Sequence, residues 1–183
     1  MKRFLAPAGG VLLGALLLLA PPTLSADPPG STPIRVAVQP QPGPLLIPVA
    51  GVSASQLFDT FNQSRGGHPH EAIDIAAPLG TPVVAVDDGK VVKLFNSKPG
   101  GLTVYQFDSA QKLAYYYAHL DRYAPGLAEK QELKRGELVG YVGSTGNADP
   151  AAPHLHFAIF ALGPEKRWWQ GTAINPYPFF AGR

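Results

Sequence analysis

The chain has 183 residues, with 15 basic and 13 acidic side chains and no cysteine. The lack of cysteine excludes disulfides, thiolate nucleophiles and cysteine metal sites. The formal net charge of +2 falls to zero if the N-terminal segment is removed, because two basic residues, Lys2 and Arg3, leave with it. The charge therefore does not indicate a nucleic-acid partner.

Residues 1–26 have the layout of a secretory signal peptide. The charged start is followed by the apolar stretch "GGVLLGALLLLAPP", and "TLSA" ends in small residues before Asp27. The apolar run is shorter than the roughly 20 residues that a bilayer span needs. We therefore predict cleavage after Ala26 and export to the periplasm, the cell envelope or the extracellular space, with no integral membrane span afterwards. A retained membrane anchor is the alternative.

Removing 26 of the 183 residues leaves 157, which is enough for one domain with its own core. Residues 27–48 are rich in proline and show no periodicity, which is typical of an extended arm or linker. From residue 49 onwards the composition changes to short, β-rich segments. We predict a single domain over residues 49–183, whose aromatic C-terminal tail wraps the surface.

The β-rich segments are short and separated by turn signals. They are "AIDIAA", "TPVVAV", "GKVVKLF", "LTVYQF", "LAYYYAHL", "ELVGYVG" and "HLHFAIF". Asp88-Gly89 predicts a hairpin turn between the second and third, and "PGG" at 99–101 separates the next pair. Only "LAEKQELKRGE" has helical character. The pattern predicts an all-β domain, mainly an antiparallel sheet.

The segment "APHLHFAIF" places two histidines on one face of a predicted strand. Side chains of an extended chain alternate with period two, so His154 and His156 point to the same side. The other side is apolar and is explained as core: Leu155, Phe157 and Ile159. The histidine side faces packing neighbours, a metal ion or a substrate.

The segment "HEAID" brings an imidazole and a carboxylate together. In an extended chain His70 and Asp74 share a face, with only the small Ala72 between them. Both groups are good Zn²⁺ ligands, and the alternative is a surface histidine beside an aspartate that caps a turn. The helical HExxH zinc motif does not fit, because the second histidine is missing and the segment is β-like. Glu71 is therefore expected to be a solvated carboxylate.

The segment "YYYAHLDRY" adds His119, so four histidines and one aspartate lie in β-like surroundings. One such histidine alone is usually a buried residue with a hydrogen-bond partner. A catalytic zinc site uses three protein ligands and leaves one position for water. Two imidazoles are then spare, one to orient or deprotonate water and one to stabilise the oxyanion or protonate the leaving amine.

The motifs "HEAID", "YAHL" and "HLHF", joined by "GTPVVAVDDGKVV" and "GELVGYVGSTG", resemble the M23 family of zinc peptidases, the lysostaphin or LytM type. The resemblance extends from about Phe58 to Phe160. It implies a LytM-type, duplicated-hybrid-motif-like β domain with one Zn²⁺ ion in a groove along the sheet. It also implies residue roles: the zinc ligands are His70, Asp74 and His156, and the unliganded catalytic pair is His119 and His154.

The chain departs from the family pattern at three places around this site. Ala72 stands where glycine is usual, which is expected to narrow the groove, and "NADPAA" lengthens the loop before "HLHF". The tyrosine that some members carry ahead of the first histidine is missing. Trp168 and Trp169 are candidates for stacking on a glycan or a stem peptide, although packing is the more common role of such a pair. Arg65 is a candidate for binding a stem carboxylate or for a structural ion pair.

The resemblance implies an endopeptidase that cuts stem peptides or cross-bridges of peptidoglycan, which is then the expected partner. A first alternative is a non-catalytic LytM-type module that activates a cell-wall amidase, with the amidase or a divisome protein as partner. Such modules lack ligands, whereas all five positions are filled here. A carrier or sugar-phosphotransfer domain is a second alternative, in which Asp74 has no role. The bond cleaved, the separate duties of the catalytic pair, any inhibitory role of the arm and the oligomeric state stay open.

Overall fold

The computed structural model describes residues 43–181. The expected signal peptide and residues 27–42 of the expected arm lie outside the described residues. Within them the chain forms a nine-stranded sheet, a separate two-stranded hairpin and very little helix, and the strand pairs are antiparallel. The expected all-β, mainly antiparallel class is confirmed. Over the same residues, no helix has the length and apolar character needed to span a bilayer.

The strands follow one another closely, as the turn signals predict. In chain order they are β1 (Ser64–Arg65), β2 (His68–Pro69), β3 (Ile73–Ala76), β4 (Pro82–Val84), β5 (Gly89–Ser97), β6 (Gly101–Asp108), β7 (Leu113–Tyr123), β8 (Glu132–Leu133), β9 (Leu138–Val142), β10 (His154–Leu162) and β11 (Gly171–Ile174). The helical segments are the 3-10 turn η1 (Ala54–Gln56) and the short helix α1 (Pro178–Ala181).

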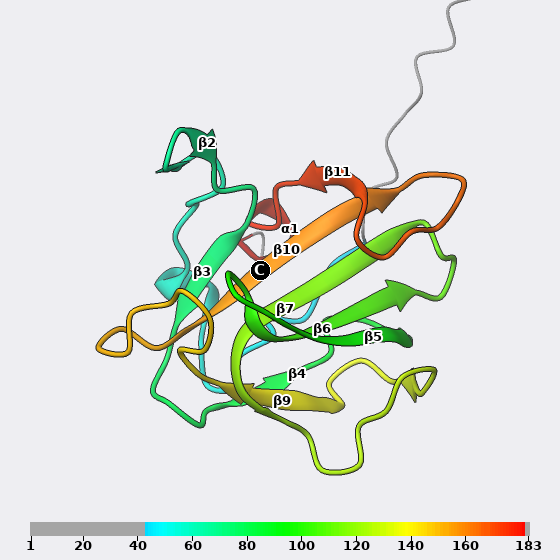
Figure 1. The fold of residues 1–183 in the computed structure, drawn as a ribbon, viewed down its shortest axis with the longest axis horizontal. Coiled ribbons are helices and arrows are strands. Elements are labelled where there is room, and N and C mark those ends of the chain that lie inside the picture. Colours follow the sequence, from blue (N-terminus) through cyan, green and yellow to red (C-terminus); the bar gives the residue numbers. More distant parts are fainter. Residues whose placement is uncertain (1–42, 182–183) are drawn as a thin grey trace, which may run out of the picture. The chain divides into compact units, whose positions relative to one another are not determined.

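The long strands β7 and β10 lie side by side at the centre of the sheet (Figure 1). The sheet order is β11-β10-β7-β6-β5-β8. In addition, β3 pairs with the first half of β10, while β9 pairs with both β7 and β4. The half of β10 that carries the two histidines is therefore flanked by β3 and β7.

The hairpin turn expected at Asp88-Gly89 does not form, because β4 pairs with β9 while β5 pairs with β6 and β8. Gly89 lacks the positive φ that a two-residue hairpin turn requires. A Cβ atom at Gly89 would lie 2.1 Å from the carbonyl oxygen of Phe107, so glycine is needed here for the close approach of β6. The loop 98–100 does join β5 to β6, as expected, and Gly101 after it takes a φ of 62°.

The segment with helical character, residues 127–137, forms turns around the two-residue strand β8. A helix this short has a costly nucleus and depends on packing to form. Here Lys130 and Gly136 take φ values of 74° and 84°, which no right-handed helix accommodates.

Residues 45–48, which the sequence assigned to the arm, pack onto the domain. Leu45 is 1% exposed, the backbone nitrogen of Leu46 donates to the carbonyl oxygen of Val86 (3.0 Å), and that of Val84 donates to Pro48 (2.9 Å). These contacts continue into the bridge between Val49 and β4. The described end of the arm thus behaves as part of the β domain.

One face of β7 and β10 is buried in the core. Tyr115 and Tyr117 of β7 are at most 1% exposed, and Leu155 and Phe157 of β10 are fully buried. The ring of Phe157 packs against Tyr117 (5.3 Å between ring centroids) and against Phe180 of α1 (5.7 Å). Because the core occupies this face, only the opposite face of β7 and β10 can present side chains to a ligand.

A buried polar network crosses this core. The hydroxyl of Tyr117 donates to Oε1 of Gln106 (2.8 Å) and accepts from the backbone nitrogen of Val86 (3.0 Å). Nε2 of Gln106 in turn donates to the carbonyl oxygen of Asp87 (2.7 Å). Burial raises the pKa of Tyr117, so its hydroxyl stays a neutral donor. The network ties β6 and β7 to the loop that follows β4.

We expect Tyr117→Phe to lower the free energy of unfolding by about 1–3 kcal/mol, because it leaves two buried polar groups without a partner. Chemical denaturation of the wild type and the variant measures this difference. Tyr115→Phe is the matched control, since the Tyr115 hydroxyl makes no side-chain hydrogen bond with residues 43–181. Equal losses for the two variants would contradict the network.

Candidate metal centre

Strand β10 carries His154 and His156 on the face opposite the core, as the alternation of "HLHF" predicted. In the sheet register His156 lies opposite Asp74 of β3 on one side and opposite Ala118 of β7 on the other. Partners that lie directly opposite in adjacent strands point to the same face. The register therefore brings the His156 imidazole and the Asp74 carboxylate together.

Three ligand atoms form a small triangle on this face. Nε2 of His70 lies 3.2 Å from Oδ1 of Asp74 and 3.1 Å from Nδ1 of His156, and Nδ1 of His156 lies 3.3 Å from the same Oδ1. Ligands about 2.0–2.1 Å from a tetrahedral zinc ion lie roughly 3.3–3.4 Å from one another. The triangle thus has the dimensions of three ligands around one small metal ion, and among residues 43–181 this trio is the group that could hold a metal.

The protonation of the triangle also favours a cation. Burial, only partly opposed by the Asp74 charge, lowers the pKa of His70, so this ring is neutral. The Asp74 pKa lies below its ordinary value, because hydrogen bonding and charge from the histidines outweigh the burial that would raise it. Oδ1 of Asp74 is buried without a geometrically acceptable hydrogen bond. A single proton can form a hydrogen bond in only one of the three short contacts between these ligand atoms. A single cation at the centre of the triangle would attract all three atoms at once.

The local conformation of "HEAID" differs from the extended chain expected. Glu71 takes a φ of 58°, and β3 begins only at Ile73. As a result Ala72 is fully buried, so the expectation that its methyl group narrows an exposed groove is wrong. Glu71 is exposed, as expected. His70 and Asp74 converge because the turn at Glu71 redirects His70, not because they alternate along one strand.

A β-bulge turns His119 out of the core. In a regular β7 this residue would follow Tyr117 onto the buried face. Two steps along β6, from Leu102 to Val104, instead correspond to three along β7, from Leu120 to Tyr117. The bulge contains His119, whose backbone lies in the left-handed region (φ 59°). Leu120 instead of His119 then points into the core, where it is fully buried. The His119 ring then lies 5.0 Å from that of His154 and 5.6 Å from that of His156.

Three of the four clustered histidines are held by backbone carbonyl groups. Nδ1 contacts a carbonyl oxygen in each: His70 with Thr60 (3.2 Å), His119 with Thr145 (2.8 Å) and His154 with Ala152 (2.8 Å). A carbonyl oxygen only accepts, so Nδ1 carries the proton and Nε2 presents a lone pair. In His154 this Nε2 lies 3.8 Å from Oδ1 of Asp74. Burial lowers the pKa of His119, which keeps its ring neutral.

The loop after β9 supports the His119 bulge through Thr145. Its hydroxyl donates to the carbonyl oxygen of Leu120 (2.8 Å) and accepts from the backbone nitrogen of Leu102 (3.0 Å). A Cβ atom on Gly101 would lie 2.1 Å from this hydroxyl oxygen, and one on Gly146 would lie 2.3 Å from the Gly101 nitrogen. The sequence did not identify Thr145 or Thr60, because both hold a histidine through backbone carbonyl groups, which have no residue-specific signature.

Arg65 forms a structural ion pair at this site. Its Nη2 donates to Oδ2 of Asp74 (2.7 Å) and to Oε1 of Gln63 (2.9 Å). This contact leaves Oδ1 of Asp74 as the oxygen that faces the two histidines. Of the three consecutive tyrosines in β7 (residues 115–117), only Tyr116 lies on this face, with its ring 5.9 Å from that of His156.

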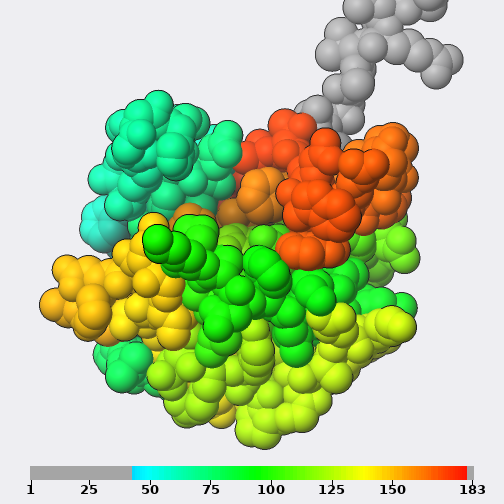
Figure 2. All heavy atoms as spheres, viewed as in Figure 1, coloured from blue at the N-terminus to red at the C-terminus, as the bar shows by residue number. Residues whose placement is uncertain are grey.

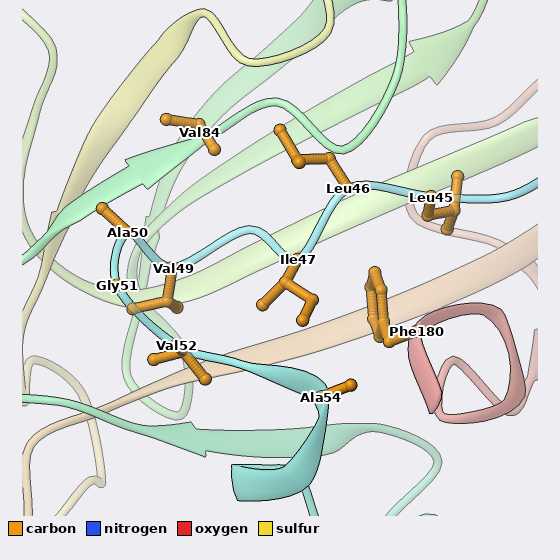
Figure 3. A pocket seen from close by; sticks show the side chains of 10 residues that line it. All are labelled: Leu45, Leu46, Ile47, Val49, Ala50, Gly51, Val52, Ala54, Val84 and Phe180. Carbon is orange, nitrogen blue, oxygen red and sulfur yellow. The ribbon is translucent and has the colours of Figure 1, made fainter. Parts of the chain in front are cut away.

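The apolar pocket in Figure 3 lies on the core side of the sheet and has no titratable lining group. Its volume is about 400 Å³, and it is lined by Leu45, Leu46, Ile47, Val49, Ala50, Gly51, Val52, Ala54, Val84 and Phe180. Phe180 packs on Phe157, whose side chain points away from the histidine face. The pocket therefore contributes nothing to the candidate metal centre.

Comparison with known proteins identifies relatives over most of the domain. The family described as Peptidase family M23 matches residues 68–176. The chain is 31% identical over 116 residues to the glycyl-glycine endopeptidase ALE-1 of Staphylococcus capitis, which covers 63% of this chain and 30% of that protein. It is 37% identical over 94 residues to the peptidoglycan DD-endopeptidase ShyB of Vibrio cholerae, covering 50% and 20%. The chain thus spans less than a third of the length of these relatives.

A solved structure extends the likeness to the fold. The catalytic domain of lysostaphin from Staphylococcus simulans superposes with a TM-score of 0.56 at 29% identity, covering 68% of this chain and 88% of that domain. The expected LytM-type fold is thereby confirmed.

We expect one divalent transition-metal ion to bind at the triangle and to raise the thermal stability. A ligand present at 100 times its Kd stabilises the folded state by about 2.7 kcal/mol. Asp74→Asn removes the charge with little change of shape and is expected to weaken metal binding by roughly tenfold or more. Competition with a chromogenic chelator measures the affinity. His68→Ala is the control, because this histidine is exposed on β2 and outside the triangle, and equal losses in both variants would argue against the site.

Thr145→Val is expected to lower the free energy of unfolding by about 1–3 kcal/mol, since it leaves the Leu102 nitrogen and the Leu120 carbonyl without their partner. Thr145→Ser keeps the hydroxyl and should recover most of the loss. Urea denaturation of the three proteins tests this. A serine variant as unstable as the valine variant would show that the methyl group, and not the hydroxyl, supports the bulge.

Proposed function

This chain belongs to peptidase family M23, and we propose that it is a zinc-dependent endopeptidase that hydrolyses peptide bonds in peptidoglycan. Its relatives support the substrate class, since one is a glycyl-glycine endopeptidase and another a peptidoglycan DD-endopeptidase. A substrate in the cell wall agrees with the export predicted from residues 1–26. The proposed location is the periplasm, the cell envelope or the extracellular space.

The observation that carries this proposal is the separation of five side chains into a ligand set and a spare pair. We propose that His70, Asp74 and His156 hold a single Zn²⁺ ion, because two nitrogens and one oxygen at tetrahedral spacing suit zinc. His119 and His154 stand beside this triangle with Nε2 available. All five residues that the resemblance requires are present.

When bound, the zinc ion acidifies a water molecule and polarises the carbonyl oxygen of the substrate. Nε2 of His119 or His154 accepts the proton that this water loses as its oxygen bonds to the carbonyl carbon. The same imidazole then returns the proton to the amide nitrogen as the C–N bond breaks. This releases an amine and a carboxylic acid, and the acid transfers its remaining proton to the amine. The Thr145 and Ala152 carbonyl oxygens keep the proton of each ring on Nδ1, and this keeps Nε2 free to accept.

The proposal is tested by incubating the purified protein with defined peptidoglycan fragments, with and without a chelator. Mass spectrometry of the products names the bond. We expect hydrolysis that stops on chelation and returns when zinc is added. His119→Ala and His154→Ala should each lower kcat by roughly 10²–10⁴-fold and leave zinc bound, because neither side chain belongs to the triangle.

His68→Ala serves as the matched control and should keep full activity, since within residues 43–181 its exposed ring hydrogen-bonds only to the neighbouring Pro69 carbonyl oxygen. Full hydrolytic activity of His154→Ala would refute the proposed division of roles. A zinc-loaded protein that cleaves no fragment would instead favour the amidase-activating module.

A further inference from the structure

A continuous row of aromatic side chains leads away from the candidate metal centre. From His156 the successive ring contacts are Tyr116 (5.9 Å between centroids), Tyr105 (4.6 Å) and Trp168 (4.8 Å). Trp168 then contacts Trp169 (5.3 Å) and Phe95 (5.5 Å). We call these five residues, without the histidine, the aromatic row.

The aromatic row runs across the strands on the histidine face of the sheet. Tyr116 of β7 lies opposite Ala158 of β10 and Tyr105 of β6, and Phe95 belongs to β5. The two tryptophans lie in the loop between β10 and β11, which folds back over β5 and β6. Figure 2 shows this face hollowed between the β1–β2 hairpin (teal) and the β10–β11 loop (orange-red), with atoms of β10 at the bottom.

The outer end of the aromatic row is exposed. Trp169 is 62% exposed and Phe95 is 40% exposed, and they are two of the four large apolar side chains exposed among residues 43–181. Packing explains Trp168, which is half-buried between Tyr105 and Phe95. It does not explain Trp169, whose aromatic contact is an edge-on one with Trp168. Exposed aromatic rings at the outer end of a row of ring contacts that starts at His156 indicate a binding surface.

The side chains of the row are uncharged and offer flat apolar faces to a ligand. Lys93, which lies opposite Tyr105 in the sheet, is paired with Glu129 (2.7 Å). The ammonium group of Lys166, in the same loop as the tryptophans, donates to the carbonyl oxygen of Gln111. Aromatic faces bind the C–H face of a sugar ring, and tyrosine hydroxyl and indole N–H groups can bond its polar edge.

We propose that the aromatic row binds the glycan strand of peptidoglycan, through its N-acetylated hexosamine rings, while the attached peptide enters the metal centre. The inference rests on the proposed function. That function places the peptide part of peptidoglycan at the metal centre, and the inference places the glycan part on the aromatic row that begins beside His156. A glycan strand is covalently joined to every stem peptide, so it lies within the extended length of that peptide, about 3.3–3.6 Å per residue, of the bond held at the metal centre. The row offers it a path that starts beside His156 and ends in solvent at Trp169.

The test measures binding of a peptide-free β-1,4-linked N-acetylglucosamine oligomer to the metal-free protein, by tryptophan fluorescence and by NMR titration. We expect wild type to bind and Trp169→Ala to bind roughly tenfold more weakly or worse. Phe58→Ala is the matched control, since Phe58 is 72% exposed and contacts no other aromatic ring in the described part of the chain. Trp169 is exposed enough that its replacement is not expected to disturb folding.

A second measurement compares hydrolysis of whole peptidoglycan with that of a sugar-free peptide carrying the same scissile bond. Trp169→Ala should raise KM for the polymer and leave both kcat and KM for the peptide unchanged. Equal losses on both substrates would mean that the row binds peptide, and this would overturn the inference. Self-association that Trp169→Ala abolishes, without sugar binding, would overturn it in favour of a second copy of the chain.

The two proposals fail separately. Oligosaccharide binding needs no hydrolysis. A protein that binds the sugar but cuts no fragment would therefore support the glycan surface and contradict the endopeptidase proposal. Hydrolysis of peptidoglycan with no sugar binding by wild type, or with sugar binding that Trp169→Ala leaves unchanged, would keep the enzyme and overturn the glycan surface.

Discussion

The candidate metal centre depends on the backbone register of β10 between β3 and β7. This register sets His156 opposite Asp74 and fixes Leu155 and Phe157 in the core. A slip of one residue would turn every side chain of β10 to the other face, which would bury two imidazoles and expose the apolar residues. The free energy of core burial therefore holds His154 and His156 in place, although both are only partly buried themselves. Chemistry on one face is positioned by packing on the other.

The second constraint is the irregularity of β7. A strand that supplied only alternating side chains would place His119 in the core beside Tyr117. The left-handed conformation of a non-glycine residue costs of the order of 1–3 kcal/mol and persists only where the surroundings determine it. Here they do so through three contacts: the His119 nitrogen with Gly100, its Nδ1 with Thr145, and the Thr145 hydroxyl with Leu120. The strain lies at a residue that the proposed mechanism uses.

The sequence predicted the parts of the structure that follow from periodicity. The all-β class, the alternation along "HLHF" and the separation of β5 from β6 at residues 98–101 all depend on local patterns, and the structure has them. The expectations that failed concerned pairing and backbone conformation. The glycine of Asp88-Gly89 is needed for contact with β6 and not for a turn, and the left-handed φ of Glu71 changes the path from His70 to β3. Neither effect is visible in residue types alone, because both depend on segments distant in the chain.

In the proposed function, the candidate metal centre and the loops around it have different roles. Both relatives are similar to this chain, yet they are named for cleaving different bonds: a glycyl-glycine bond in one and a DD linkage in the other. The proposed ligand triangle of this chain cannot by itself choose between two such bonds, because it would contact only the scissile group. Selection must lie in surfaces that reach further, which here are the β1–β2 hairpin, the loop 147–152 and the β10–β11 loop. Of these, the β10–β11 loop connects to a metal-centre residue through side chains in direct contact, from Trp169 to His156. On the proposed glycan surface, the β10–β11 loop is therefore the part of the site that would distinguish a polymer from a free peptide.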